Sequence, residues 1–159
     1  MLSMDKEAIK ELTEMEAVPR CNILGSLLGR SVKMSVSNVE DMGSLAEGLP
    51  HFNVAIESRK AVGGMSADQL YIFAKEDMIR LTNYIMGVPV DAQSPLDEIA
   101  LSTLKEVASQ CVGAAMDELN DFLGRDMRDT ITRISAFDNT ERIQDIIRSW
   151  NAEDSVLLM

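Results

Sequence analysis

The fold of this chain is decided by the stretch DEIALSTLKEVASQCVGAAMDELNDFLGR, residues 97–125. Apolar residues recur in it every three to four positions, which is the spacing of one buried helix face. They are Leu101, Leu104, Val107, Ala108, Cys111, Val112, Ala115, Phe122 and Leu123. A proline and two acidic residues stand where a helix begins, and Gly124 stands where one ends. The pattern predicts a long helix that starts near Ser94–Pro95 and packs on a sheet by its apolar side.

A shift of the chain by 95 residues places an earlier segment onto this helix. The pair Lys-Glu at 10–11 then falls on the same pair at 105–106, and the run Leu-Gly-Arg at 28–30 falls on the same run at 123–125. These identities at one offset favour a duplication over a chance match between two amphipathic helices. We therefore predict a second long helix over residues 4–28, related to the first by a pseudo-twofold axis.

Shorter segments around the two helices complete an α+β pattern. Alternating apolar and polar residues are typical of half-buried strands, and a return to helical spacing predicts further helices. The predicted strands are 32–36, 52–56, 70–73, 131–137 and 156–159, and the predicted shorter helices are 76–86 and 139–147. The expected fold class is thus α+β, with a long surface helix followed by antiparallel strands in each repeat and both helices packed on one sheet.

The predicted organisation is a single domain over residues 1–159. It divides into a first repeat over about 4–87, a linker at 88–94 and a shortened second repeat over about 95–159. The apolar strand at the very end of the sequence indicates either an edge strand or a chain shorter than its relatives.

Composition narrows the classes of function. There are 15 Lys and Arg against 26 Asp and Glu, a formal net charge of −11. Such an acidic surface repels nucleic acids and anionic lipids. No apolar run approaches the roughly 20 residues that span a bilayer, and the first residues lack the apolar core of a signal peptide. We therefore expect a cytoplasmic protein with neither nucleic acid nor membrane as its partner.

The cysteines and the histidine point to no metal site or cofactor. Cys21 and Cys111 lie in half-apolar helical surroundings without a CxxC motif, so we expect two reduced, mostly buried thiols. His51 follows Pro50 near a predicted strand and has no partner nucleophile or acid beside it, which is typical of a loop histidine.

The outward faces of the two long helices carry matching carboxylates. In the first helix Ile9, Leu12, Met15 and Val18 are expected to point inward, which turns Glu11 and Glu14 outward. In the second helix Ser102, Glu106 and Ser109 form the equivalent stripe at i, i+4 and i+7. Glutamates are common on any solvated helix, but the recurrence of one glutamate in both copies favours a function.

This arrangement resembles the CheC-type chemotaxis phosphatases and the related flagellar switch protein FliY. Their surface helix carries the pattern [Asp/Ser]-x-x-x-Glu-x-x-Asn twice. Residues 97–107 resemble the second helix of that family, and residues 75–87 resemble the helix that closes its first repeat. The resemblance implies a CheY-type response regulator as partner, a glutamate that pairs with its lysine, and an asparagine that orients the attacking water. The Mg²⁺ of that reaction belongs to the regulator, so no cofactor of the chain itself is implied.

The sequence departs from the family at the asparagine. Glu14 stands there in the first helix, and its negative charge should oppose binding of a phosphorylated regulator. Ser109 stands there in the second helix, and its hydroxyl is shorter than an amide. Gln110 has an amide, but one residue along a helix corresponds to a turn of about 100°. The first motif is thus degenerate, and the second keeps Ser102 and Glu106 without the usual water-positioning group.

Three hypotheses follow. The first is a bacterial chemotaxis or flagellar switch protein that binds a CheY-type response regulator with weak or lost phosphatase activity. The second is an active phosphatase of the regulator's aspartyl phosphate that uses Glu106 and Ser109. The third is a structural assembly module of the motor switch, in which an exposed sheet edge pairs with another subunit, for example in a homodimer.

Overall fold

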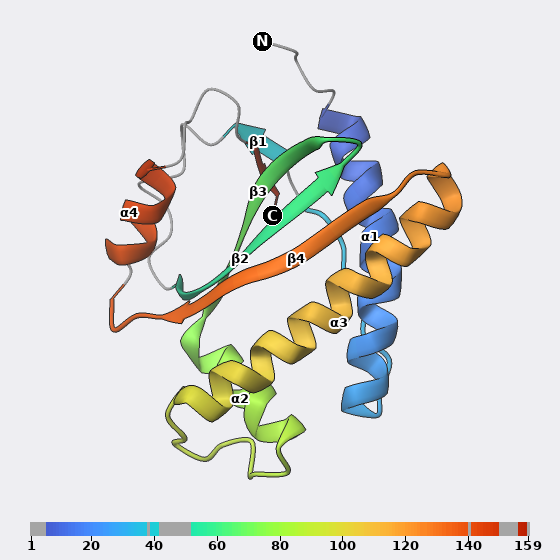
Figure 1. Ribbon diagram of the computed structural model, residues 1–159. Coiled ribbons are helices and arrows are strands. Elements are labelled where there is room, and N and C mark those ends of the chain that lie inside the picture. The colour runs from blue at the N-terminus through green and yellow to red at the C-terminus, as the bar shows by residue number, and fades with distance from the viewer. Residues whose placement is uncertain (1–5, 38, 42–51, 140, 150–155, 159) are drawn as a thin grey trace.

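The computed structural model describes residues 6–37, 39–41, 52–139, 141–149 and 156–158. These parts of the chain form four helices and five strands, whose arrangement can be followed in Figure 1. Their order is α1 (Lys6–Leu28), β1 (Val39–Asp41), β2 (Phe52–Val62), β3 (Met65–Ala74), α2 (Lys75–Ile85), α3 (Glu98–Leu123), β4 (Met127–Ala136), α4 (Glu141–Ser149) and β5 (Val156–Leu158). His51 lies outside the described residues.

A three-stranded antiparallel sheet in the order β3-β2-β4 separates two layers of helices. Neighbouring residues of a strand face opposite sides of a sheet. Accordingly Ala55 packs with Ile143 of α4 on one side, while Ile56 packs with Val112 of α3 on the other. The α1 helix lies beside α3 in the same layer (Figure 1). This architecture confirms the predicted α+β class, with the helices packed on the sheet.

The α3 helix is fixed by its two ends and by one apolar face. The Asp97 carboxylate accepts a hydrogen bond from the Ala100 amide at 2.9 Å and caps the helix. This cap starts the helix at Glu98, so the predicted start near Ser94–Pro95 is wrong by a turn. Gly124 ends it with φ of 61°, a left-handed conformation that suits glycine. The buried residues are Ala100, Leu104, Val107, Cys111, Val112, Ala115, Met116 and Leu119.

The α1 helix continues through Pro19, and its buried face matches the predicted one only in part. Ile9 is buried and Met15 packs against the core, as expected. Leu12 and Val18, expected to point inward, are 43% and 60% exposed, whereas Glu16 is only 6% exposed. Glu16 is buried because two cations meet it. Its Oε2 accepts from Nη2 of Arg20 at 2.5 Å, and its Oε1 accepts from the Lys60 ammonium of β2. A buried charge is tolerated only when it is paired in this way.

The predicted strand at 32–36 is wrong, because residues 30–37 form no helix or strand. Its alternating pattern finds no neighbouring strand to pair with, and β1 instead pairs antiparallel with β5 further along the chain. The predicted strands 52–56 and 70–73, in contrast, both lie within the β2–β3 hairpin, whose strands extend further toward the turn. Its turn is made by Gly63 and Gly64, which have φ of 54° and 89°.

The two long helices agree at some positions of the 95-residue offset and differ at others, since Leu12 is exposed where Val107 is buried. Ile9 and Leu104 are both buried, and Gly29 and Gly124 both adopt φ of 61°. The agreement ends with the helices, because only α3 is followed directly by a long strand. The pseudo-twofold axis, and the division of one domain into two repeats, stay predictions.

The buried Glu16 gives a prediction about stability. The side chains of Lys60 and Arg20 are largely buried, and the change Glu16→Ala removes the carboxylate that neutralises them. We expect it to lower the free energy of unfolding by about 3 kcal/mol, measured by urea denaturation. The matched control is Asp68→Ala, which removes the solvent-exposed Arg59–Asp68 pair and should change stability little. Equal losses for the two variants would contradict the role given to Glu16.

The cysteines give a second prediction. Both are free thiols, but only Cys111 is buried, and Cys21 is half-buried. Burial raises the pKa of the Cys111 thiol, so at pH 8 less of it is the reactive thiolate. We expect iodoacetamide to modify Cys21 well before Cys111 in the native protein, followed by mass spectrometry of peptides. In urea the two rates should converge, and a native Cys111 that reacts as fast as Cys21 would contradict this placement.

Candidate functional site

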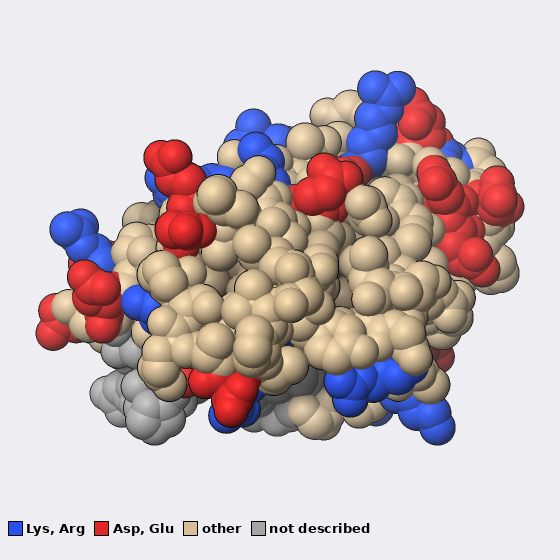
Figure 2. Space-filling model, turned by 90° about the horizontal axis from the view of Figure 1, so that it is seen from below, with Lys and Arg blue, Asp and Glu red and all other residues tan. Residues whose placement is uncertain are grey.

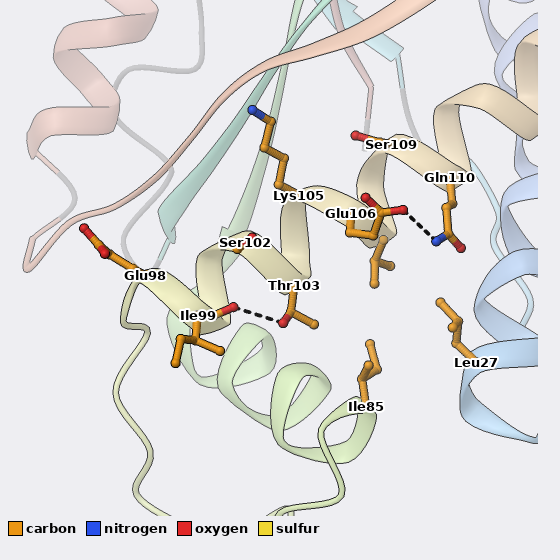
Figure 3. A pocket seen from close by; sticks show the side chains of 11 residues that line it. Leu27, Ile85, Glu98, Ile99, Ser102, Thr103, Lys105, Glu106, Ser109 and Gln110 are labelled. Carbon is orange, nitrogen blue, oxygen red and sulfur yellow. Dashed lines mark hydrogen bonds between the residues drawn. The ribbon is translucent and has the colours of Figure 1, made fainter.

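An open groove of about 680 Å³ runs along the exposed side of α3. It lies where the first half of α3 meets the ends of α1 and α2 (Figure 3). Its lining residues are Leu27 of α1, Ile85 of α2, and Glu98, Ile99, Ser102, Thr103, Lys105, Glu106, Val107, Ser109 and Gln110 of α3. The groove therefore brings together three elements that are far apart in the sequence.

Three of the predicted site residues line this groove. Ser102, Glu106 and Ser109 lie on successive turns of α3, on the side away from its buried face. Ser102 and Glu106 are exposed, and Ser109 is half-buried. The spacing i, i+4 and i+7 places them on one stripe because a helix turns once in 3.6 residues. The position of this stripe follows directly from which residues of α3 face the sheet.

Gln110 is a groove residue that sequence reasoning placed elsewhere. Its Nε2 donates a hydrogen bond to Oε1 of Glu106 at 2.9 Å, as Figure 3 shows. Its backbone lies about 100° around the helix from that of Ser109, but long helical side chains lean toward the N-terminal end and onto the preceding turn. The sequence contained a signal for this hydrogen bond, because Glu and Gln side chains four residues apart on a helix surface can form a favourable pair.

An apolar wall borders the polar stripe. Leu27 and Ile85 lie opposite α3 across the groove, and Ile99 of α3 is 64% exposed. The ends of α1 and α2 are tied together, because the Tyr84 hydroxyl donates to the Leu28 carbonyl at 2.8 Å. This wall was not predicted from the sequence because it combines single residues from separate helices.

The same apolar character extends over the adjoining surface. Figure 2 shows this side of the molecule from below, with a broad central area free of Lys, Arg, Asp and Glu and with charges at the margins. Exposed large apolar residues of the elements at this end are Leu27, Tyr84, Met86, Val90 and Ile99. An apolar surface with a charged margin is a common feature of protein interfaces.

The remaining predicted residues lie apart from the groove. Glu11 and Glu14 are exposed on α1, and neither lines the groove on α3. The structure thus gathers the second-helix residues into one site and leaves the first-helix residues outside it. Within the described residues, no three His, Cys, Asp or Glu side chains form a cluster that could hold a metal ion.

Comparisons with known proteins find the fold but no sequence relative. No protein-family model matches the sequence, and no curated protein matches it significantly. Among solved structures, FliY of Thermotoga maritima matches 99% of this chain and 86% of its own, with a TM-score of 0.75 and 17% identity. The FliG–FliM complex of H. pylori matches 98% of this chain and 85% of its own, with a TM-score of 0.70 and 12% identity.

A chemotaxis protein is also among the solved structures of similar fold. CheX of Vibrio vulnificus matches 81% of this chain and 80% of its own, with a TM-score of 0.61 and 12% identity. In the parts of the chain that the structure describes, no helix combines the length and the apolar content that crossing a membrane requires. The chain therefore has the fold shared by the FliY, CheC-like and CheX proteins.

Proposed function

We propose that this chain is a chemotaxis or flagellar switch protein that binds a CheY-type response regulator through the groove on α3. The observation that supports the proposal most is the convergence of Ser102, Glu106 and Ser109 on one exposed stripe beside an apolar wall. These are the positions that correspond to the family motif. The fold, which is that of FliY and CheX, is consistent with such a role.

Glu106 is the proposed anchor of the partner. Gln110 holds one of its carboxylate oxygens, and the other can accept a hydrogen bond from a lysine of the regulator. A charge-assisted hydrogen bond of this kind contributes roughly 1.5–3 kcal/mol when it is shielded from water. Leu27, Ile85 and Ile99 supply apolar surface beside the carboxylate, and contact with the partner there would exclude water from the ion pair.

The regulator would bring its own Mg²⁺ and its phosphoaspartate to the groove. The chain then needs no cofactor of its own, and its place of action is the cytoplasm, where such regulators work. Phosphoryl transfer requires mainly positioning and charge stabilisation, so a few polar side chains on one rigid helix can influence it. Ser109, which replaces the asparagine of the motif, would by itself support only weak phosphatase activity.

A structural role in the motor switch is the second candidate. It is favoured by the exposed apolar residues next to the groove, because a surface of this kind suits a lasting contact with another subunit. One structure of similar fold is that of a FliG–FliM complex. In this role the apolar surface would carry the contact, and Glu106 would contribute little to it.

The two candidates differ in their response to one substitution. Removing the carboxylate by Glu106→Ala should weaken binding of a beryllofluoride-activated CheY-type receiver from the same organism. The expected increase in Kd is about ten- to a hundredfold, the equivalent of the lost charge-assisted bond. Isothermal titration calorimetry with Mg²⁺ present measures it, and the effect should shrink at high salt.

The matched control is Glu11→Ala, which removes an exposed carboxylate from α1 outside the groove. It should leave the affinity for the receiver unchanged. If Glu11→Ala weakens binding and Glu106→Ala does not, the regulator docks on the first helix. If the wild-type chain does not bind the receiver at all, the assembly role replaces the proposed function.

A further inference from the structure

The amide of Gln110 lies over the helical turn that carries the proposed anchor. Its Nε2 donates to Oε1 of Glu106 at 2.9 Å, and both side chains line the groove. With the nitrogen held in this way, the amide oxygen is directed away from Glu106 and toward the side of the groove where Leu27 lies (Figure 3). The chain therefore presents an oriented amide in the groove, although asparagine is missing from the motif.

This amide is attached to a rigid support. Val107 and Cys111, the residues beside Glu106 and Gln110 in the sequence, are both buried against the rest of the fold. The α3 backbone is thereby fixed, and the solvent-exposed hydrogen bond to Glu106 favours this orientation of the glutamine side chain before any partner arrives. Such preorganisation lowers the entropic cost of holding a water molecule or a reacting group.

Ser109 is less suited to the same task. Its hydroxyl is attached directly to Cβ, so it reaches less far than a glutamine amide, and the residue is half-buried. In Figure 3 its side chain points away from the Glu106–Gln110 pair. Of the two polar residues at this turn, Gln110 is thus the one whose polar group lies next to the carboxylate that anchors the partner.

We propose that Gln110 supplies the amide that positions water for hydrolysis of the receiver's aspartyl phosphate. This inference rests on the proposed function, because it requires the receiver to dock at Glu106. A carboxylate has room for several hydrogen bonds, so Glu106 can hold Gln110 with one oxygen and the partner's lysine with the other. The anchor and the amide are then aligned through a single side chain.

The proposed reaction is a simple hydrolysis. The amide oxygen of Gln110 accepts a hydrogen bond from the water and directs the water oxygen at phosphorus. The new bond forms between that oxygen and phosphorus, while the bond from phosphorus to the aspartyl oxygen breaks with its electron pair. The products are the aspartate carboxylate and dihydrogen phosphate, which takes the oxygen and both protons of the water and then releases one proton to the solvent according to the pH.

The test compares Gln110→Met with the wild-type chain. Methionine keeps the length of the side chain and its helix propensity but removes the amide. A CheY-type receiver from the same organism is phosphorylated with a small-molecule phosphodonor in the presence of Mg²⁺, and release of phosphate is followed at saturating protein. We expect Gln110→Met to lower the acceleration of hydrolysis about tenfold or more, the order of effect seen when one preorganised polar group is removed.

If Gln110 only supported the structure of the groove, its replacement would weaken binding of the receiver together with the rate of hydrolysis. A role in positioning water predicts a loss of rate without a comparable loss of affinity. The Kd for the beryllofluoride-activated receiver should change less than about threefold. The matched control is Gln144→Met, which makes the same change on α4 outside the groove and should keep the wild-type rate. A loss of rate in Ser109→Ala but not in Gln110→Met overturns the assignment. A wild-type chain that binds the receiver without accelerating hydrolysis also overturns it and leaves the proposed function standing, whereas absence of binding removes both.

Discussion

The structure depends on the burial of one side of α3 against the three-stranded sheet. Leu104, Val112 and Leu119 are almost completely buried, and they fix both the position of the helix and its rotation about its own axis. A helix held in this way has no freedom in what it presents to solvent. The stripe with Glu106 is exposed because the opposite stripe is buried, so the site is a direct consequence of the core.

The elements of the fold that could be predicted from the sequence are those with strong local patterns. The α3 helix and the β2–β3 hairpin carry their own periodicity and turn residues. The helix was predicted to within about a turn of its observed bounds, whereas the two strands were predicted in the right places but at less than half of their observed length. The buried face of α1 could not be predicted locally, because Glu16 is neutralised partly by Lys60, a residue 44 positions away. The strand expected at 32–36 failed for a related reason, since alternation identifies a strand only where a partner is present.

The residues of the candidate site could likewise be predicted only where they follow from the geometry of a single helix. The stripe of Ser102 and Glu106 followed from helical geometry together with the family resemblance, and the structure places both in the groove. The 100° separation of Gln110 from Ser109 holds in the structure, but its hydrogen bond to Glu106 depends on the reach of the side chain along the helix, which the angle alone does not describe. The apolar wall of Leu27 and Ile85 depends on how separate helices pack, and no local pattern encodes it.

The buried charges between α1 and the sheet also constrain how this sequence can change over evolutionary time. Replacing Glu16 alone would leave two cations without their partner, and replacing Lys60 alone would leave the carboxylate supported only by Arg20. An all-apolar version of the contact would require coordinated changes at all three positions. Positions 16, 20 and 60 should therefore vary together among descendants of this chain, even where exposed residues far from the groove diverge freely.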